Sequence, residues 1–248
     1  MRRDVSWLDP TQTDVWPAAV NIRATTRIGP EGDFELGGPI DADRVEAHRA
    51  ALPGLLGVRR VEFLRQVHGT VVYEAGEHPP AALPEADAAV TGARGVALAI
   101  LTADCLPVLL CDRAGTRIAA AHAGWRGLAA GVLEATVMAL DLPRSEVIAW
   151  LGPSIGEAAF EIGPEVRSEL LDRTPASLRA ASTACIRGGR GDRWHADLAA
   201  LARLRLRGTG VGEVRGSVED VYADPTRYFS HRRDGGRTGR QASVIWLS

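Results

Sequence analysis

Residues 96–101 read Val-Ala-Leu-Ala-Ile-Leu, an unbroken apolar run, and residues 106–111 continue as Leu-Pro-Val-Leu-Leu-Cys. A third apolar stretch, residues 117–122, ends at His122. Continuous apolar runs of this length are typical of strands that are covered on both faces. The three runs therefore predict a buried sheet at the centre of the molecule.

Further elements are expected on both sides of this core. Strands are predicted at residues 20–27, 147–151 and 241–247, with a strand pair at 61–73 broken at Gly69. Helices are predicted at 43–52 (capped by Asp41 or Asp43), at 128–140, from 163 onward and at 197–206. Residues 1–20 are expected to form an irregular lead-in, and residues 29–39 and 187–192 are expected to form loops. Strands and helices mix without a strict βαβ order. The sequence predicts an α+β fold, a single domain over residues 1–248 with mixed β-sheets flanked by helices.

Composition narrows the class of protein. The chain of 248 residues is 46% apolar and carries a net charge of −2, so it has no basic surplus for nucleic acid. No apolar run approaches the roughly 20 residues of a membrane span, and the start lacks the apolar stretch of a secretory signal. Three cysteines do not make a disulfide framework. We expect a cytoplasmic protein that acts on a small molecule and not on nucleic acid or a membrane.

The chain contains no lysine, and all 29 basic residues are arginine. A Schiff base, the attachment of pyridoxal phosphate and a Walker A loop all need a lysine. Those three chemistries are excluded.

Three short segments carry residues that can bind a metal. Gln-Val-His-Gly contains His68, Thr-Ala-Asp-Cys ends at Cys105, and His-Ala-Gly-Trp-Arg-Gly begins at His122. Zinc binds imidazole nitrogen and thiolate sulfur, and three protein ligands leave a fourth position for water or substrate. The separations of 37 and 17 residues are too long for a zinc finger and suit ligands on separate elements of a core. We predict a catalytic zinc site at these three residues, with copper as the alternative metal.

The other cysteines are expected to be packing residues. If residues 105–111 are extended, the sulfurs of Cys105 and Cys111 lie roughly 20 Å apart at about 3.3 Å per residue, so they cannot share an ion. Cys185 lies in an Ala/Ser/Thr stretch. The histidines at positions 48, 78 and 195 are left out of the site.

Two segments are candidates for binding an anion. Residues 124–127, Gly-Trp-Arg-Gly, lead into a helix, and free N–H groups at a helix start attract anions. Residues 228–240 place four arginines near three glycines, and arginine forks match phosphate or carboxylate. A solvated basic turn explains the second segment equally well.

Taken together, the segments resemble the YfiH family, also called the laccase-domain or peptidoglycan-editing-factor family. The resemblance covers nearly the whole chain. The matching segments are Thr25-Thr26-Arg27, the three metal-ligand motifs, residues 151–156 with 160–166, and residues 229–234 with 238–240.

The resemblance implies a zinc-dependent purine nucleoside enzyme, which phosphorolyses adenosine, inosine and methylthioadenosine and deaminates adenosine. It implies a fold similar to bacterial cytotoxic cysteine deamidases. On this reading Arg27, Arg126 and Arg233 bind substrate and phosphate, and Asp104 or Glu161 moves protons. A thiolate and two neutral imidazoles leave the Zn²⁺ site with net charge +1, which lowers the pKa of bound water.

The chain departs from the family pattern near the expected substrate pocket and not at the metal ligands. Residues 28–32 read Ile-Gly-Pro-Glu-Gly where the family has Gly-Gly-Val-Ser, and no asparagine follows Asn21. His48-Arg49 stands for the usual Asn-Arg, Asp220-Val221-Tyr222 for a Cys-Thr pair, and His231 for a tyrosine.

Three alternative functions are considered, and the first of them is rejected as the primary activity. Older descriptions of the family give a copper polyphenol oxidase, but six histidines are too few for a multicopper site, and a blue-copper site would need an axial Met from only Met1 or Met138. A metal-free hydrolase would use Cys105 as nucleophile and His122 or His68 as base, cutting an amide in a peptidoglycan precursor. The third alternative is a metal-binding protein without catalysis.

Overall fold

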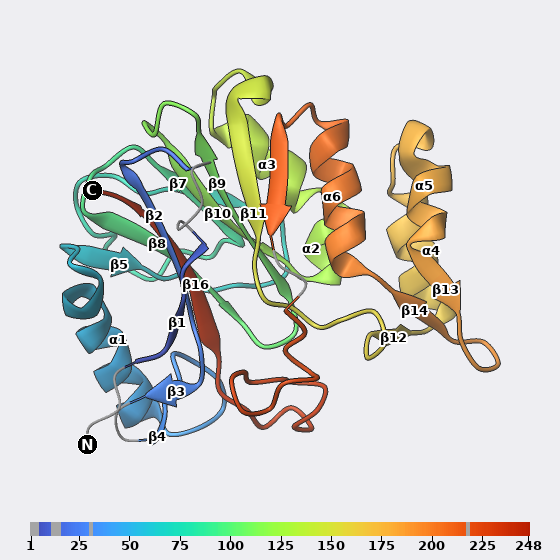
Figure 1. Cartoon of the computed structure of the whole chain (residues 1–248), viewed down its shortest axis with the longest axis horizontal. Coiled ribbons are helices and arrows are strands. Elements are labelled where there is room, and N and C mark those ends of the chain that lie inside the picture. The colour runs from blue at the N-terminus through green and yellow to red at the C-terminus, as the bar shows by residue number, and fades with distance from the viewer. Residues whose placement is uncertain (1–4, 11–15, 30–31, 217–218) are drawn as a thin grey trace.

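The computed structural model describes residues 5–10, 16–29, 32–216 and 219–248 (Figure 1). Two β-sheets form its centre. One has the strand order β1 (Trp7–Leu8), β2 (Val20–Thr25), β16 (Gln241–Leu247), β8 (Val96–Thr102), β5 (Arg60–Glu62). The other has the order β15 (Glu213–Gly216), β11 (Val147–Leu151), β9 (Leu106–Asp112), β10 (Ile118–Ala123), β7 (Ala88–Thr91), β6 (Val72–Glu74). A three-stranded sheet β12 (Glu161–Ile162), β14 (Trp194–Ala196), β13 (Ile186–Gly188) and the pair β3 (Ile28–Gly29), β4 (Gly32–Asp33) complete the strands described.

The two large sheets pack face to face, and the alternation along β8 shows why. Leu98 and Ile100 point into a core shared with Leu109 and Ile118 of the opposite sheet. Ala99, between them, points to the outer face, where it packs in a cluster with Leu52 of a helix. Side chains alternate between the faces of a strand, so one apolar run supplies two cores. This is why β8 shows no polar face in the sequence.

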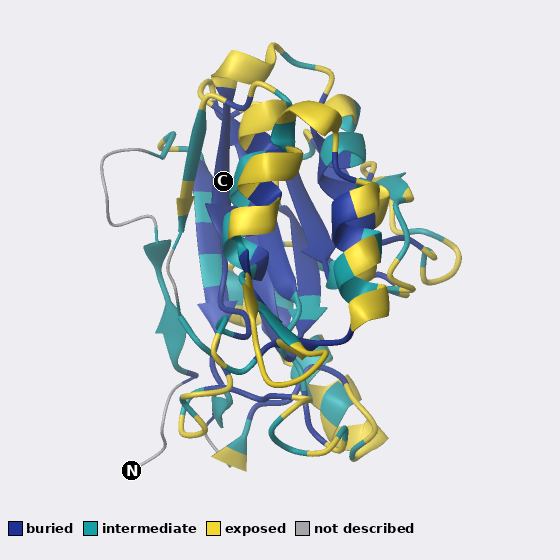
Figure 2. Cartoon of the chain, turned by 90° about the vertical axis from the view of Figure 1, so that its right-hand side faces the viewer, coloured by how far each residue is buried: buried dark blue, intermediate teal, exposed yellow. Residues whose placement is uncertain are grey.

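Helices cover the outer faces of both sheets, which leaves the strands dark in the burial view (Figure 2). α1 (Ala42–Leu56) covers the five-stranded sheet and begins at Asp41, whose side chain accepts from the N–H groups of Asp43 and Arg44. The helices on the other side are α2 (Trp125–Ala130), α3 (Val132–Ala139), α4 (Pro164–Asp172), α5 (Arg179–Ala184) and α6 (Leu198–Gly208), with short turns at Arg144–Glu146 and Ala176–Leu178. Asp197 caps α6 through the N–H of Ala200. The layers run helix, sheet, sheet, helix.

The α+β prediction, with mixed sheets flanked by helices, is confirmed, and so are the strands expected from residues 20, 96, 106, 117, 147 and 241. Residues 1–4 and 11–15 of the expected lead-in, and residues 30–31 of the expected loop, lie outside the described residues. None of the helices in the described ranges is long and apolar enough to cross a membrane.

Two larger predictions about elements were wrong, and the loops expected at 29–39 and 187–192 overlap β3, β4 and β13. Residues 61–73 do not form a strand pair: β5 belongs to the five-stranded sheet and β6 to the six-stranded sheet. The expected helix 128–140 is two helices, because Gly131 adopts φ +100° and ends α2 with its N–H bonded to the carbonyls of Gly127 and Leu128. Glycine enters this left-handed region at little cost.

Candidate metal centre

Two crossings of the chain between the large sheets carry His68 and Cys105. Residues 63–71 run from β5 to β6, and residues 103–105 run from β8 to β9, so each crossing passes the same end of the sandwich. The Gln66 side chain joins the crossings: its amide donates to the Leu101 carbonyl at 2.8 Å and accepts from the Leu101 N–H at 2.9 Å. Gln66 therefore binds the edge of β8 as a neighbouring strand would.

His122 reaches the same place from β10. In the β9–β10 register it lies opposite Pro107, two residues beyond Cys105. The ligand atoms of His68, Cys105 and His122 all lie within 4.8 Å of one another, and Cys105 Sγ is 3.9 Å from His68 Nε2. The structure thus brings together the three residues that the sequence singled out.

The chemistry and the surroundings of this cluster fit a metal ion. Two imidazoles and a thiolate are zinc ligands at about 2.0–2.3 Å from the ion, and donors on one such ion lie well under 5 Å apart. Gly124 leaves the space: a Cβ there would lie 2.9 Å from His68 Cδ2 and 3.0 Å from Cys105 Sγ. Any larger residue would crowd two of the ligands.

A buried carboxylate that the sequence analysis missed orders the cluster. His122 Nδ1 donates to Asp87 Oδ1 at 2.8 Å, which leaves Nε2 for an ion. The same carboxylate accepts from the backbone N–H groups of Val67, His68 and Gly69 at 3.1, 2.9 and 2.6 Å. Outer carboxylates of this kind fix the ring orientation and tautomer of metal-binding histidines.

Backbone strain marks both crossings. His68 has φ 63° and Asp104 has φ 91°, in the left-handed region that non-glycine residues rarely occupy. Such conformations persist only where surrounding contacts hold them. The N–H bond to Asp87 holds His68, and Asp104 accepts from Ser230 Oγ and the Arg232 N–H, both at 2.6 Å. Asp104 therefore anchors the C-terminal loop beside Cys105.

The cluster alters the acidity of its own members. Burial alone would raise the pKa of the Cys105 thiol, but hydrogen bonds and charge from His122 and His68 lower it to about 6. Burial would lower the pKa of His122, but Asp87 and Cys105 raise it to about 9. Without a metal, the pair is therefore a thiolate beside an imidazolium near neutral pH. A thiolate is the form of cysteine that binds metals and attacks electrophiles.

A cavity of about 590 Å³ opens onto the cluster. Ile155, Phe160 and Trp125 give it apolar walls, and Gly37 and Gly38 form a narrow part of its lining. Four arginines also line it: Arg49, Arg126, Arg232 and Arg240. Sites for small molecules are mainly apolar clefts of about 300–1,000 Å³ with a few placed polar groups. The cavity has the size and lining of such a site, with an excess of positive charge.

The structure places the three predicted substrate-binding arginines in different surroundings. Arg126 lines the cavity and lies over the ring of Trp125 at 4.4 Å. Arg27 lines a separate hollow, paired with Asp33 and lying over Phe229 at 4.9 Å.

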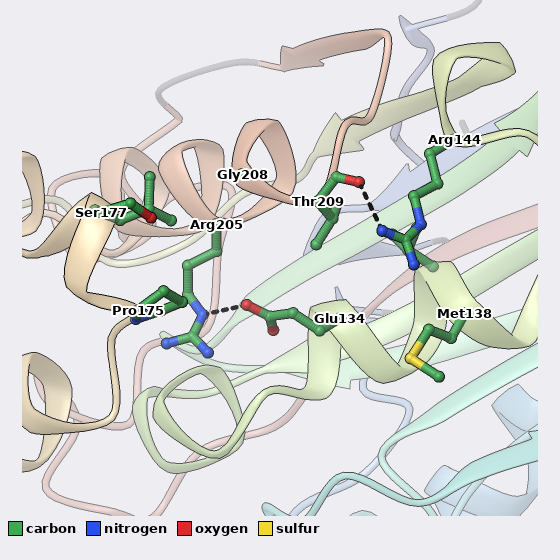
Figure 3. A pocket seen from close by; sticks show the side chains of 10 residues that line it. Glu134, Met138, Arg144, Pro175, Ser177, Arg205, Gly208 and Thr209 are labelled. Carbon is green, nitrogen blue, oxygen red and sulfur yellow. Dashed lines mark hydrogen bonds and ion pairs between the residues drawn. The ribbon is translucent and has the colours of Figure 1, made fainter.

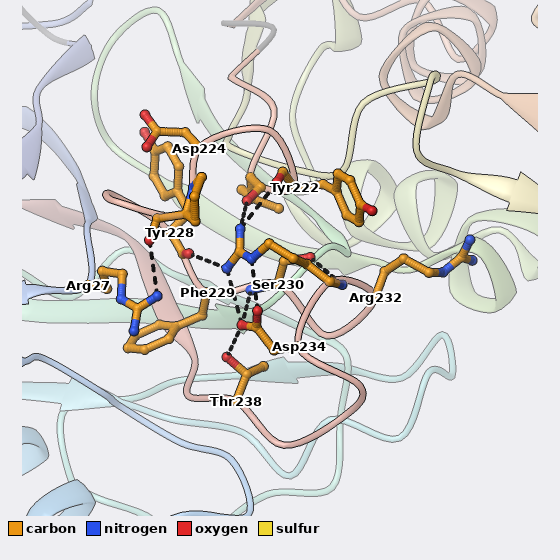
Figure 4. Close-up of polar contacts among 12 residues, drawn as sticks. Arg27, Tyr222, Asp224, Tyr228, Phe229, Ser230, Arg232, Asp234 and Thr238 are labelled. Carbon is orange, nitrogen blue, oxygen red and sulfur yellow. Dashed lines mark hydrogen bonds and ion pairs between the residues drawn. The ribbon is translucent and has the colours of Figure 1, made fainter.

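Arg233 lies inside the C-terminal loop and outside the cavity lining. It donates to the carbonyls of Val221 and Tyr228 at 2.8 Å and pairs with Asp234 at 2.8 Å (Figure 4). Its contacts are those of a residue that closes a loop. Asp104 lines the cavity, while Glu161 is exposed on β12 and does not.

The sequence analysis did not name two of the cavity residues, Arg49 and Arg240, as site residues. Arg49 lies on α1 and Arg240 directly before β16, 191 positions apart in the chain. Arg240 was one of four arginines in a candidate anion-binding segment, and Arg49 was noted only as part of a departure from the family pattern. A basic residue on a helix looks like solvated surface until the tertiary fold is known.

The cysteines and histidines left out of the site, at positions 48, 78, 111, 185 and 195, do not line the cavity, whereas His231 does. Cys111 is buried in β9, and burial raises its pKa to about 12. His48 Nδ1 contacts the Glu35 carbonyl, and His195 Nδ1 the Glu157 carbonyl. Met138 is 68% exposed on α3 and does not line the cavity, so among the described residues no methionine stands at the cluster as an axial ligand.

A second hollow of about 270 Å³ lies between α3 and α6 (Figure 3). Arg205 donates to Glu134 at 2.7 Å across it, and Met138 and Leu178 line its apolar part. It shares no residue with the cavity at the cluster. Glu134 and Arg205, the ion pair in this hollow, neutralise each other, so they do not point to a charged ligand.

Fold and site together define a class: a two-sheet α+β protein with a His–Cys–His centre at the mouth of an arginine-lined cavity. Residues 33–248 match the family model described as multi-copper polyphenol oxidoreductase laccase. The chain is 46% identical to a purine nucleoside phosphorylase of Pseudomonas aeruginosa over 98% of both chains. It is 44% identical to the purine nucleoside phosphorylase YfiH of Escherichia coli over 94% of this chain and 96% of the other.

Solved structures agree. A Neisseria meningitidis protein with 40% identity superimposes with a TM-score of 0.87, covering 98% of this chain and 99% of its own. YlmD of Geobacillus stearothermophilus, 25% identical, gives 0.88 over 100% and 98%. The chain belongs to the YfiH family.

Proposed function

We propose that the protein is a metal-dependent purine nucleoside phosphorylase, with zinc at His68, Cys105 and His122. The observation that carries the proposal is that one cavity joins this donor set to apolar walls and to four arginines. A nucleoside and phosphate need these features together: a surface for the base and positive charge for the anion. The relatives named purine nucleoside phosphorylase over nearly the full chain length support the same reaction.

In phosphorolysis a phosphate oxygen forms a bond to C1′ of the sugar while the bond from C1′ to the purine nitrogen breaks, and the base leaves with a proton. In the cavity, Phe160 and Ile155 would hold the base away from water, and Trp125 offers a ring face at the entrance. Positioning of this kind converts a two-molecule reaction into a step within one complex.

Two carboxylates outside the ligand set, Asp87 and Asp104, have supporting roles that follow from their contacts. Asp87 keeps the His122 proton on Nδ1, and Asp104 holds the C-terminal loop against the cavity. A bound zinc ion would supply a Lewis acid and an activated water. Water attack at C6 of adenosine, with loss of ammonia, gives inosine, so we include adenosine deamination as a second activity. The substrates proposed are adenosine, inosine and methylthioadenosine.

Copper is the second candidate for the metal, because the family model carries a copper-oxidase description and Cys with two His also binds copper. A metal-free Cys–His amide hydrolase is favoured by one observation, that Cys105 Sγ and a ring nitrogen of His122 lie within 4.8 Å, where the imidazole lowers the pKa of the thiol. A non-catalytic metal-binding protein would leave the cavity without a role.

Mass spectrometry of adenosine incubated with zinc-loaded protein separates these functions. Adenine with ribose 1-phosphate, formed only when phosphate is present, is the expected result. Inosine formed without phosphate shows deamination. Full turnover in chelator by protein that holds no metal would contradict the proposal, and zinc binding without turnover of any nucleoside would leave only the non-catalytic role.

A further inference from the structure

Two of the four cavity arginines, Arg49 and Arg240, are half-buried, whereas Arg126 and Arg232 are exposed. Arginines outside the cavity lining, Arg27, Arg44 and Arg233, pair with Asp33, Glu35 and Asp234. Within the described residues, neither Arg49 nor Arg240 forms an ion pair. Both are half-buried in the cavity wall. Burying a charge without a partner costs free energy, so two half-buried guanidinium groups in one cavity wall leave room for an anion.

Backbone contacts hold both guanidinium groups in place. Arg49 Nε donates to the Leu36 carbonyl at 2.7 Å, and its Cζ lies 4.7 Å from the Phe63 ring centre. Arg240 Nη1 donates to the carbonyls of Thr238 and Gly239 at 3.0 and 2.9 Å. Both Nη groups of Arg49, and Nε and Nη2 of Arg240, have no hydrogen-bond partner in the described part of the chain. These donors are fixed in place and unused.

The two side chains meet at a glycine. A Cβ on Gly37 would lie 3.4 Å from Arg49 Nη2 and 3.4 Å from Arg240 Cγ. Burial lowers the pKa of Arg240. The negative charges of Cys105 and Asp104 oppose this shift, which shows that the guanidinium lies near both. Arg49 and Arg240 therefore lie beside the metal-ligand cluster, and the backbone of Gly37, which carries no side chain, lies against both.

We propose that Arg49 and Arg240 form the subsite for the phosphate that attacks the sugar. The assignment rests on the proposed phosphorylase function, and it replaces Arg27 and Arg233 as the phosphate ligands. Two fixed arginine forks match the oxygens of a tetrahedral oxyanion. Two ligands carry such an oxyanion: free inorganic phosphate and the phosphate group of a nucleotide. The structure favours free phosphate because the subsite lies beside the metal-ligand cluster.

Calorimetric titration of inorganic phosphate into metal-free protein tests the subsite separately from turnover. We expect Arg49→Gln and Arg240→Gln each to weaken phosphate binding by about 10-fold or more, as loss of a charge-assisted hydrogen bond implies. Arg173→Gln, an exposed arginine of α4 paired with Glu169, is the matched control and should bind as wild type does. Arg49→Lys and Arg240→Lys, which keep the charge, serve if a Gln variant fails to fold.

The outcomes separate the subsite from the proposed function. Unchanged phosphate binding in folded variants of both arginines overturns the subsite, even if the wild type phosphorolyses nucleosides. Phosphate binding that both variants lose, with no phosphorolysis in the wild type, supports the subsite and overturns the function. In active protein we expect KM for phosphate to rise and KM for inosine to stay constant. Weakened binding of adenosine 5′-monophosphate with unchanged binding of phosphate overturns free phosphate as the occupant.

Discussion

The Asp87 carboxylate accepts a hydrogen bond from His122 Nδ1 at 2.8 Å and, through three backbone N–H groups, also holds the segment that carries His68. One fully buried side chain thus orients two of the three candidate metal ligands. The β7–β10 register, which sets Ala88 opposite Ala121, places Asp87 beside His122. The metal centre depends on this contact as much as on its own donors.

Asp87→Asn should weaken zinc binding by about 10–100-fold, the effect typical of removing an outer carboxylate. The amide cannot accept from His122 and three N–H groups as a carboxylate does. Competition with a chelator measures the affinity. Asp112→Asn is the control, since Asp112 is buried and accepts from Thr116 and Arg117 in a turn away from the cluster. Equal zinc affinities in the two variants would refute the role of Asp87.

Gly124→Ala should reduce zinc affinity while leaving the fold intact. Its backbone, at φ −60°, accepts any residue, but the new methyl would lie 2.9 Å from the His68 ring. Overpacking of this kind costs about 1–3 kcal/mol, which corresponds to a loss of about 5–150-fold in affinity. Gly54→Ala is the comparison, because a Cβ there meets nothing within 4 Å and α1 should gain about 0.5–1 kcal/mol. Wild-type zinc affinity in Gly124→Ala would show that the space is not needed.

The Cys105 thiol of metal-free protein should react with iodoacetamide at a rate that rises with pH to a plateau, with a midpoint near its pKa of about 6. Below that pH the thiolate, which is the nucleophile, becomes protonated and the rate falls. Cys111, buried and with a pKa raised to about 12, should stay unlabelled. Peptide mass spectrometry across pH 5–9 reads each cysteine separately.

Zinc should protect Cys105 from the same reagent at every pH. If metal-loaded protein is labelled as fast as metal-free protein, Cys105 is not a ligand, and the Cys–His hydrolase becomes the better account. Cys105→Ala supplies the blank for the assay.

Arg233→Gln should lower the free energy of unfolding by about 1.5–3 kcal/mol, because bonds from a charged donor to buried acceptors are lost. The carbonyls of Val221 and Tyr228 would be left without their donor. Urea denaturation measures the change. Arg237→Gln, exposed in the same loop, should stay within about 0.5 kcal/mol of wild type. A fully stable Arg233→Gln protein that no longer binds phosphate would return Arg233 to the substrate site.

The sequence was sufficient for the parts of the structure that local patterns decide. The apolar runs that became β8, β9 and β10 predict their strands because burial on both faces leaves no polar alternation. The cap at Asp41 follows from short-range chemistry. The three residues of the cluster were found because their residue types are rare and their segments carry motifs.

What the sequence could not show depends on contacts between distant segments. The 61–73 stretch looks like a hairpin because nothing local says that its two strands join different sheets. Asp87 stands in an ordinary Glu-Ala-Asp-Ala segment and gains its role only through the register of β7 with β10. Arg233 and Arg240 look alike in sequence, and only the fold shows that one closes a loop and the other lines the cavity.

The most direct test of the central claim is the zinc content of purified protein by mass spectrometry of the metal. We predict about one zinc ion per chain in the wild type, and almost none in folded Cys105→Ala and His122→Ala, because removing a ligand from a three-residue site abolishes tight binding. Cys185→Ala should keep its zinc. Wild-type zinc content in Cys105→Ala and His122→Ala would contradict the account.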